Sequence, residues 1–146
     1  MAIELSPFIA GLIGGIVSWF VTQSVAEPLR RFLGMRRDIA QHLLDYDNVA
    51  AARDVDGKRL EQFDEQDAAR LRDAQKKLRE FATQTLSYVQ TDAVATNLIR
   101  WLWRYDPMKA GRSLIGLSNT LGAYGEERHR HRNNIRDALR IKPLSS

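Results

Sequence analysis

The chain contains no cysteine among its 146 residues. This absence excludes disulfide bonds, thiolate metal sites and a cysteine nucleophile, and it fits a reducing compartment. Catalytic signatures are missing as well, because the sequence holds no nucleophile elbow, phosphate-binding loop, zinc-protease helix or dinucleotide-binding turn. We therefore assign no catalytic residue and no cofactor, and we expect a binding or anchoring protein rather than an enzyme.

Charge is absent from one long stretch, which runs from Pro7 to Ala26 and reads PFIAGLIGGIVSWFVTQSVA. A helix of about 20 apolar residues is long enough to cross the hydrocarbon core of a bilayer. A secretory signal would begin with basic residues, but only Glu4 is charged before this stretch, while Arg30 and Arg31 follow it. An uncleaved transmembrane anchor is thus favoured over its two alternatives, a signal peptide and a buried core helix.

The arginines beyond the apolar stretch also predict its orientation. Basic flanks stay in the cytoplasm, so we expect the N-terminus outside and the residues from 27 onward inside, at the cell membrane. Residues 1–26 then form the N-terminal segment with the transmembrane helix at about 7–26. Residues 27–146 are enough for one compact cytoplasmic domain and too few for two comfortable cores.

Gly11 and Gly15 form a G-x-x-x-G pair inside the apolar stretch. This spacing allows two membrane helices to approach closely, and a single-span chain has no partner helix of its own. We therefore predict a homo-oligomer that associates through the glycine face. The alternative is that glycine is simply common in membrane helices.

Helical periodicity dominates the remainder, and no stretch alternates like a half-buried strand. We predict an all-α fold, in which the transmembrane helix continues into a cytoplasmic bundle of three to four helices. The expected helical segments are Glu27–Arg53, Glu65–Gln90, a separate or bent segment from a Thr91-Asp92 cap to Tyr105, and Pro107–Ile141.

Apolar residues repeat at intervals of three and four in each segment, which predicts the buried faces. On the first segment the face consists of Leu29, Phe32, Leu33, Ile39, Leu43 and Tyr46. On the third it includes Val94, Leu98, Trp101, Leu102 and Tyr105. Asp106-Pro107 is typical of a helix start. The last segment either stays continuous or breaks between Gly122 and Gly125.

Basic residues are concentrated in the C-terminal third. Residues 100–146 carry 10 basic against 4 acidic side chains, whereas residues 27–99 carry 12 against 13. Within this part, we expect Arg128, His131 and Arg132 to receive an anion, since arginine forks match phosphate oxygens. The partner could be an acidic protein, an anionic lipid or a nucleotide; nucleic acid is less favoured. The alternative is an ordinary charged surface helix.

Metal sites are not predicted. His129 and His131 are two residues apart, which turns them away from each other on a helix, and no cysteine completes a zinc shell. The acidic turn Asp54-Val55-Asp56-Gly57 lacks the ligand spacing of a calcium loop. We interpret it as a solvated connection.

One aromatic residue is a candidate for a surface contact. Trp101, Trp103 and Tyr105 lie between or beside Arg100 and Arg104. Core packing explains Trp101, but Trp103 lies off the predicted apolar face. We therefore expect Trp103 to contact a partner or the membrane.

Together these patterns predict a single-pass membrane protein that self-associates and acts as a binding, scaffold or signalling module at the cytoplasmic face. In layout it resembles the small membrane-tethered effectors of bacterial defence systems, in which ligand binding to a soluble bundle rearranges membrane helices. That resemblance implies the second hypothesis, a ligand-gated effector whose helical domain binds a nucleotide or another anion. The likeness is one of layout and rests on no motif.

Overall fold

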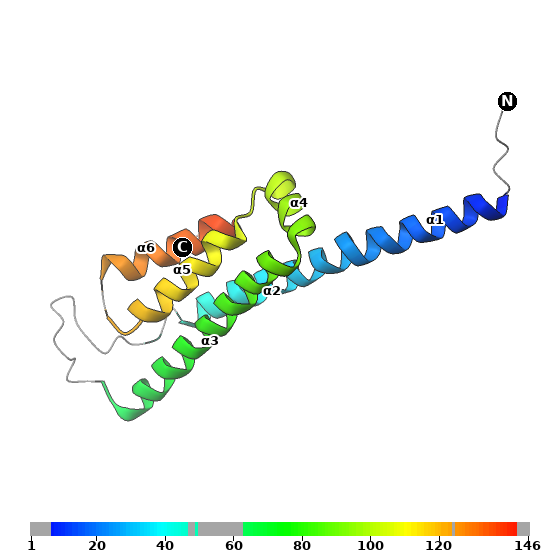
Figure 1. The fold of residues 1–146 in the computed structure, drawn as a ribbon. Coiled ribbons are helices and arrows are strands. Elements are labelled where there is room, and N and C mark those ends of the chain that lie inside the picture. The colour runs from blue at the N-terminus through cyan, green and yellow to red at the C-terminus, as the bar shows by residue number, and fades with distance from the viewer. Residues whose placement is uncertain (1–6, 47–48, 50–62, 124, 143–146) are drawn as a thin grey trace.

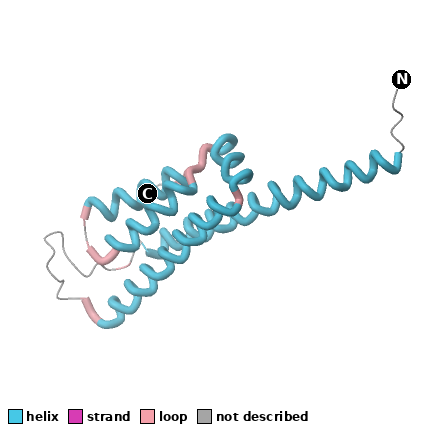
Figure 2. Tube along the Cα trace, in the orientation of Figure 1, coloured by secondary structure: helices cyan, strands magenta, loops and turns pink. Residues whose placement is uncertain are grey.

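The computed structural model describes residues 7–46, 49, 63–123 and 125–142. The described residues form helices joined by short connections, with no strand among them (Figure 2), so the all-α prediction is confirmed. The elements are α1 (Pro7–Val21), η1 (Thr22–Ala26), α2 (Glu27–Asp45), α3 (Glu65–Thr91), α4 (Ala93–Trp103), α5 (Pro107–Thr120) and α6 (Glu126–Leu139).

The first three elements form one long rod whose α1 end projects from the bundle (Figure 1). The turn η1 is a π-helix, and the Glu27 N–H donates to the carbonyl of Thr22, five residues earlier. Pro28 follows directly, and a proline ring clashes with the carbonyl four residues before it, here that of Ser24. The wider π turn gives room for this ring, so the helix continues into α2 without a break.

The bundle core lies between α2, α3, α5 and α6, with the inner side of α4 closing one end (Figure 1). Phe32, Ile39 and Leu43 point into it as predicted. Leu33 does not, because it lies about 100° around the helix from Phe32, and Met35 takes the place on the buried face instead. On α3 the core residues are Leu71, Ala74, Leu78, Phe81, Ala82, Thr85 and Tyr88.

Two helices begin at capping aspartates. The Asp106 carboxylate accepts a hydrogen bond from the Lys109 N–H at 3.0 Å, with Pro107 in the first turn, as predicted. Asp64 caps α3 in the same way, through the Asp67 N–H at 2.7 Å. Asp92 holds the N-cap position of α4 but makes no cap bond. Its carboxylate instead lies 3.4 Å from the Arg31 guanidinium, so the predicted side-chain cap is wrong.

The C-terminal region divides into two helices. α5 ends at Thr120 and α6 begins at Glu126, so the chain breaks around Gly122 and Gly125 rather than continuing. The two helices then pack closely: a Cβ added at Gly116 would collide with the His131 ring. This arrangement places part of the polar α6 surface against α5.

Candidate functional site

Exposed hydrophobic side chains are concentrated on two helices. Of fifteen exposed large hydrophobic residues in the described chain, eight lie on α1 and four on α4. The α1 residues are Ile9, Leu12, Ile13, Ile16, Val17, Trp19, Phe20 and Val21, and the α4 residues are Val94, Trp101, Leu102 and Trp103. We call these two sets together the apolar end of the molecule.

α1 projects from the bundle (Figure 1), and in the described chain its main contacts are with the next turn, η1. One continuous helix, Ile9–Asp45, is long and apolar enough by length and composition to cross a membrane, and none of its apolar window is buried. No protein atom lies within 4 Å of a Cβ added at Gly11, Gly14 or Gly15. The predicted glycine face is therefore open along its whole length.

α4 is apolar on two opposite sides. Ala95, Thr96 and Ile99 are buried against the bundle. Val94 and Trp101, seven residues apart, lie on the other side, and Leu102 lies at the edge of the buried side, seven residues after Ala95. All three are exposed, with 78% of the Trp101 surface accessible. We call this outer face the α4 stripe.

The predicted burial of Val94, Trp101 and Leu102 is wrong, because all three are exposed. The apolar residues of α4 repeat as predicted, but the face that they form points away from the bundle. Periodicity locates an apolar face without saying what covers it, so a helix with two apolar sides leaves the orientation open. The small inner residues Ala95 and Thr96 carried too little hydrophobicity to reveal the true buried side.

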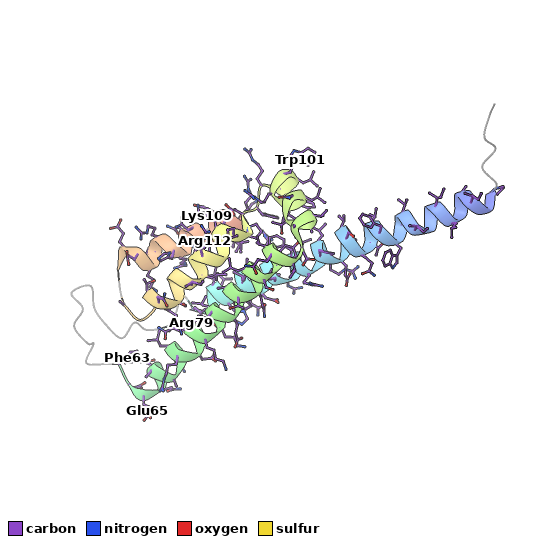
Figure 3. All side chains as sticks on the ribbon, viewed as in Figure 1. Phe63, Glu65, Arg79, Trp101, Lys109 and Arg112 are labelled. Atoms are coloured by element: carbon purple, nitrogen blue, oxygen red, sulfur yellow. The ribbon has the colours of Figure 1, made fainter. Side chains whose placement is uncertain are left out.

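α4, which carries the α4 stripe, lies beside the C-terminal end of α1. α4 contacts both η1 and α2, and Figure 1 shows it running across the direction of α1 rather than along it. Trp101 projects away from the bundle at the far end of α4 (Figure 3). Arg104, in a left-handed conformation with φ 55°, ends the helix there.

Exposed arginines surround this junction. Arg30 lies in the second turn of α2, Arg31 pairs with Asp92, and Arg100 and Arg104 occupy the last turn and the end of α4. All four are exposed. The junction between α1, α2 and α4 therefore combines apolar surface with basic side chains.

Trp103, the predicted contact residue, is 39% exposed and lies in the last turn of α4 near this junction. Its contact with a partner or membrane stays a prediction. The neighbouring Trp101, at twice that exposure, is the more accessible indole.

The predicted anion residues lie along α6. Arg128 donates to the carbonyls of Leu121 at 3.4 Å and Val49 at 3.3 Å, which ties α6 to the end of α5. The His131 ring packs on Gly116, and Arg132 is half-buried with a contact of its own. Arg128 and His131 thus take part in the packing of α6, and the binding of an anion by the three residues stays a prediction.

Two further regions concern metal ions. No group of three or more histidine, aspartate or glutamate side chains suited to a metal lies in the described part of the chain. The acidic turn 54–57 is outside the described residues.

Two tyrosines, the half-buried Tyr46 and the buried Tyr88, have raised pKa values. Burial raises the pKa of Tyr46 to about 12, and Asp73, Asp45 and Glu80 add to the rise. Burial likewise raises the pKa of Tyr88 to about 12, with Asp92 adding and Arg31 opposing. Both are neutral at physiological pH.

Comparison with known proteins gives no further assignment. No protein family, curated protein or solved structure matches this chain.

Proposed function

We propose that this chain is a single-pass membrane protein that holds a helical bundle against the cytoplasmic face of the membrane and self-associates there as a binding or scaffold module. The observation that carries the proposal is the gathering of exposed hydrophobic surface on α1 and α4, at one end of the molecule. A large contiguous apolar surface is typical of a membrane or protein interface.

The first membrane contact is α1. An α-helix satisfies its own backbone hydrogen bonds, so an isolated apolar helix can cross the hydrocarbon core. Trp19 near its end and Arg30 beyond it match the order in which an indole and then a cation meet the headgroups. This order supports an N-terminus outside and a bundle inside.

The second contact is the α4 stripe. A helix with an apolar outer face and a basic C-terminal end is suited to lie in the plane of the headgroups. Trp101 and Leu102 would enter the leaflet, while Arg100 and Arg104 would extend to lipid phosphates. With α1 fixed across the bilayer, α4 already lies beside its inner end.

Self-association is supported by the open glycine face. Gly11, Gly14 and Gly15 present backbone to the surroundings with nothing of the chain nearby. In a bilayer, close backbone packing drives helices together because the lipid is as apolar as the side chains. A second copy of α1 would fill this face.

Alkaline extraction of membranes tests the anchor. The wild-type protein should stay in the pellet. Leu12→Asp with Ile16→Asp should release it, because each aspartate near the span centre costs about 2.5–3.5 kcal/mol of insertion. Leu33→Asp with Leu44→Asp, at exposed leucines of α2, is the matched control and should remain in the membrane. Release of the wild type would overturn the proposal.

Cysteine labelling tests the orientation, and the cysteine-free sequence makes each introduced thiol unique. In intact cells or spheroplasts, a membrane-impermeant maleimide should label Ala2→Cys. Asn119→Cys, exposed on α5, should react only after lysis. The reverse pattern would place the bundle outside.

Detergent-corrected light scattering tests the assembly. Gly11→Ile with Gly15→Ile should lower the mass of the particle, because the larger side chains hold two helices apart. Leu12→Ile, on another side of α1, introduces the same residue as a control and should leave the mass unchanged. An oligomer of unaltered mass in the glycine variant would exclude this face.

Lipid quenching tests the α4 stripe. A protein retaining only Trp101, with Trp19→Phe and Trp103→Phe, should lose fluorescence in nanodiscs that contain acyl-brominated lipid. The matching protein that retains only Trp103 should be quenched less, since that indole is half as exposed. No quenching of Trp101 would leave α4 outside the bilayer.

The ligand-gated effector is the second candidate. It is favoured by the unbroken helix from Ile9 to Asp45, through which a movement of the bundle would reach α1. Its π turn is of a kind often found at functional positions. Addition of ATP should change the yield of Val17→Cys cross-links between protomers; a constant yield would count against gating by this nucleotide.

A further inference from the structure

A cavity of about 330 Å³ opens between α4, α5 and α6, apart from the basic residues of α6 discussed above. Three cations line it: Arg100 from α4, and Lys109 and Arg112 from α5. Figure 3 shows Lys109 and Arg112 on the same helix, one turn apart. With Val89 of α3 also in the lining, side chains from four helices meet at one hollow.

Among the described residues, none of these three cations forms an ion pair. In the described chain, the ion pairs join other residues, and no hydrogen bond from these three side chains is formed. The acidic side chain on the cavity wall is that of Asp106, whose Oδ1 accepts the cap bond from the Lys109 N–H, so the wall carries one carboxylate and three cations. The cavity therefore has an excess of positive charge.

The cavity also has a buried donor without an acceptor. Thr96 is 5% exposed, lines the cavity, and its hydroxyl makes no hydrogen bond. Other helical threonines of this chain, such as Thr85 and Thr91, donate to the carbonyl four residues back at 2.7 and 3.0 Å. A buried hydroxyl left unpaired costs about 1–3 kcal/mol, which an incoming acceptor would recover.

Two more polar side chains complete the wall. Ser113 is buried at 6% exposure, and Asn134 approaches from α6. Hydroxyl and amide groups both donate hydrogen bonds, arginine offers a planar fork, and lysine offers a compact charge. This donor set, with cations at the rim and hydroxyls at the floor, matches the several oxygens of a phosphate group.

We propose that this cavity binds a phosphate group, carried either by a small soluble phosphate ester or by a phospholipid headgroup. Its volume lies at the small end of the roughly 300–1,000 Å³ range of ligand pockets, which suits a phosphate with a small attached group. Arg100 belongs to the last turn of α4, so the cavity lies directly behind the helix that presents the α4 stripe. Both sources of phosphate remain within reach of such a position.

Sequence reasoning missed this site for a physical reason. Arg100, Lys109, Arg112 and Asn134 each look like ordinary solvated positions of separate helices. Only the packing of α4 and α6 beside the start of α5 brings them together.

Isothermal titration of the full-length protein in neutral detergent tests the proposal, with inorganic phosphate and glycerol 3-phosphate as probes at constant ionic strength. Saturable binding is expected. Arg112→Gln should weaken it at least tenfold, whereas Arg70→Gln, an exposed arginine of α3 with the same loss of charge, should not change it. Equal losses in the two variants, or no saturable binding of either probe, would overturn the site.

Thr96→Val separates the floor hydroxyl from charge. The variant keeps the shape of the side chain and all cations, so a general attraction for anions would be unaffected. We expect at least a threefold loss of phosphate affinity and an unchanged or higher melting temperature without phosphate. Unaltered affinity in a folded variant would contradict the proposed floor.

Nanodiscs separate the two sources. If glycerol 3-phosphate binds the protein in discs of neutral lipid, the ligand is a soluble ester. If binding requires phosphatidic acid in the disc, and Thr96→Val weakens it while Arg70→Gln does not, the ligand is the headgroup. Phosphatidic acid binding that depends on Trp101 but not on Thr96 would overturn the cavity. The titration in detergent needs no bilayer, so it stands apart from the test of anchoring.

Discussion

α4 and α6 reverse the usual relation between polarity and burial. α6 reads EERHRHRNNIRDAL, yet Arg128, His131 and Arg132 are half-buried, and Ile135 and Leu139 are part of the core. α4 reads AVATNLIRWLW, yet Val94, Trp101 and Leu102 face outward. Composition alone would have assigned the opposite positions to these helices.

The difference between α6 and α4 indicates how each helix uses its surface. The arginines and histidine of α6 are used within the protein, because Arg128 bonds two carbonyls and His131 fills the space left by Gly116. On α4, by contrast, Ala95 and Ile99 serve the core, while Val94 and Trp101 remain 63% and 78% exposed in the described chain. Surface that costs solubility and adds nothing to the bundle is typical of an interface.

The largest effect should come from truncating one apolar residue on each helix. Ile135→Ala removes a side chain that is 0% exposed and should lower the free energy of unfolding by about 2–5 kcal/mol. Trp101→Ala removes a larger side chain at 78% exposure and should change it by less than about 0.5 kcal/mol. Denaturant titration of the bundle in detergent, followed by circular dichroism, measures both.

Equal destabilisation by the two substitutions would break the comparison. It would mean that the α4 stripe is covered by the protein itself or by another copy in detergent. Detergent-corrected light scattering of the same sample distinguishes the two, because only coverage by another copy requires an oligomer.

The next effect concerns the close contact between α5 and α6. Gly116→Ala places a methyl group where the His131 ring lies, so we expect a loss of about 1–3 kcal/mol of stability. Gly34→Ala is the control: nothing lies within 4 Å there, and a helix gains about 0.5–1 kcal/mol from the change.

Thermal unfolding of both variants measures the difference. Adding His131→Ala to Gly116→Ala should restore part of the lost stability, since the clash is then removed. If Gly116→Ala alone keeps the wild-type melting temperature, the His131 ring moves aside at no cost. The packing of α6 against α5 would then be loose at this position.

The helices, and much of the core, could be predicted from sequence. Asp106-Pro107 marked the start of α5 because the cap and the proline act locally. The buried face of α3 could be predicted because the opposite side of that helix is charged. The outward face of α4 could not be found, since Ala95 and Ile99 compete with Trp101 and only tertiary packing decides between them. Local patterns likewise gave no sign of the cavity, because its lining comes from four separate helices.

A smaller effect is expected at Arg128. Arg128→Met keeps the packing of the aliphatic stem but removes the bonds to the Leu121 and Val49 carbonyls, so stability should fall by about 1 kcal/mol. The phosphate affinity of the cavity lined by Arg100, Lys109 and Arg112 should be unchanged. Chemical denaturation and titration on the same preparation distinguish the two roles; retained stability with lost phosphate binding would return the anion site to α6.

The smallest effect extends the comparison to a single polar group. Tyr88 is 3% exposed, its hydroxyl has no hydrogen-bond partner among the described residues, and its ring lies 5.5 Å from that of Phe32. Burial raises its pKa to about 12, whereas the unfolded phenol ionises near 10.0. The stability gained by keeping it neutral is therefore complete below pH 10 and is lost as the pH rises toward 12.

Tyr88→Phe keeps the ring and removes both the ionisation and the unpaired hydroxyl. Its stability at pH 7 should equal or slightly exceed that of the wild type. Between pH 10 and pH 11 the wild type should lose about 1 kcal/mol more than the variant, because Tyr46 and the other groups titrate equally in both. If the stabilities of the wild type and the variant change in parallel across that interval, the Tyr88 hydroxyl contacts water in the folded protein. The burial of polar groups would then be a property of α6 and would not extend to Tyr88.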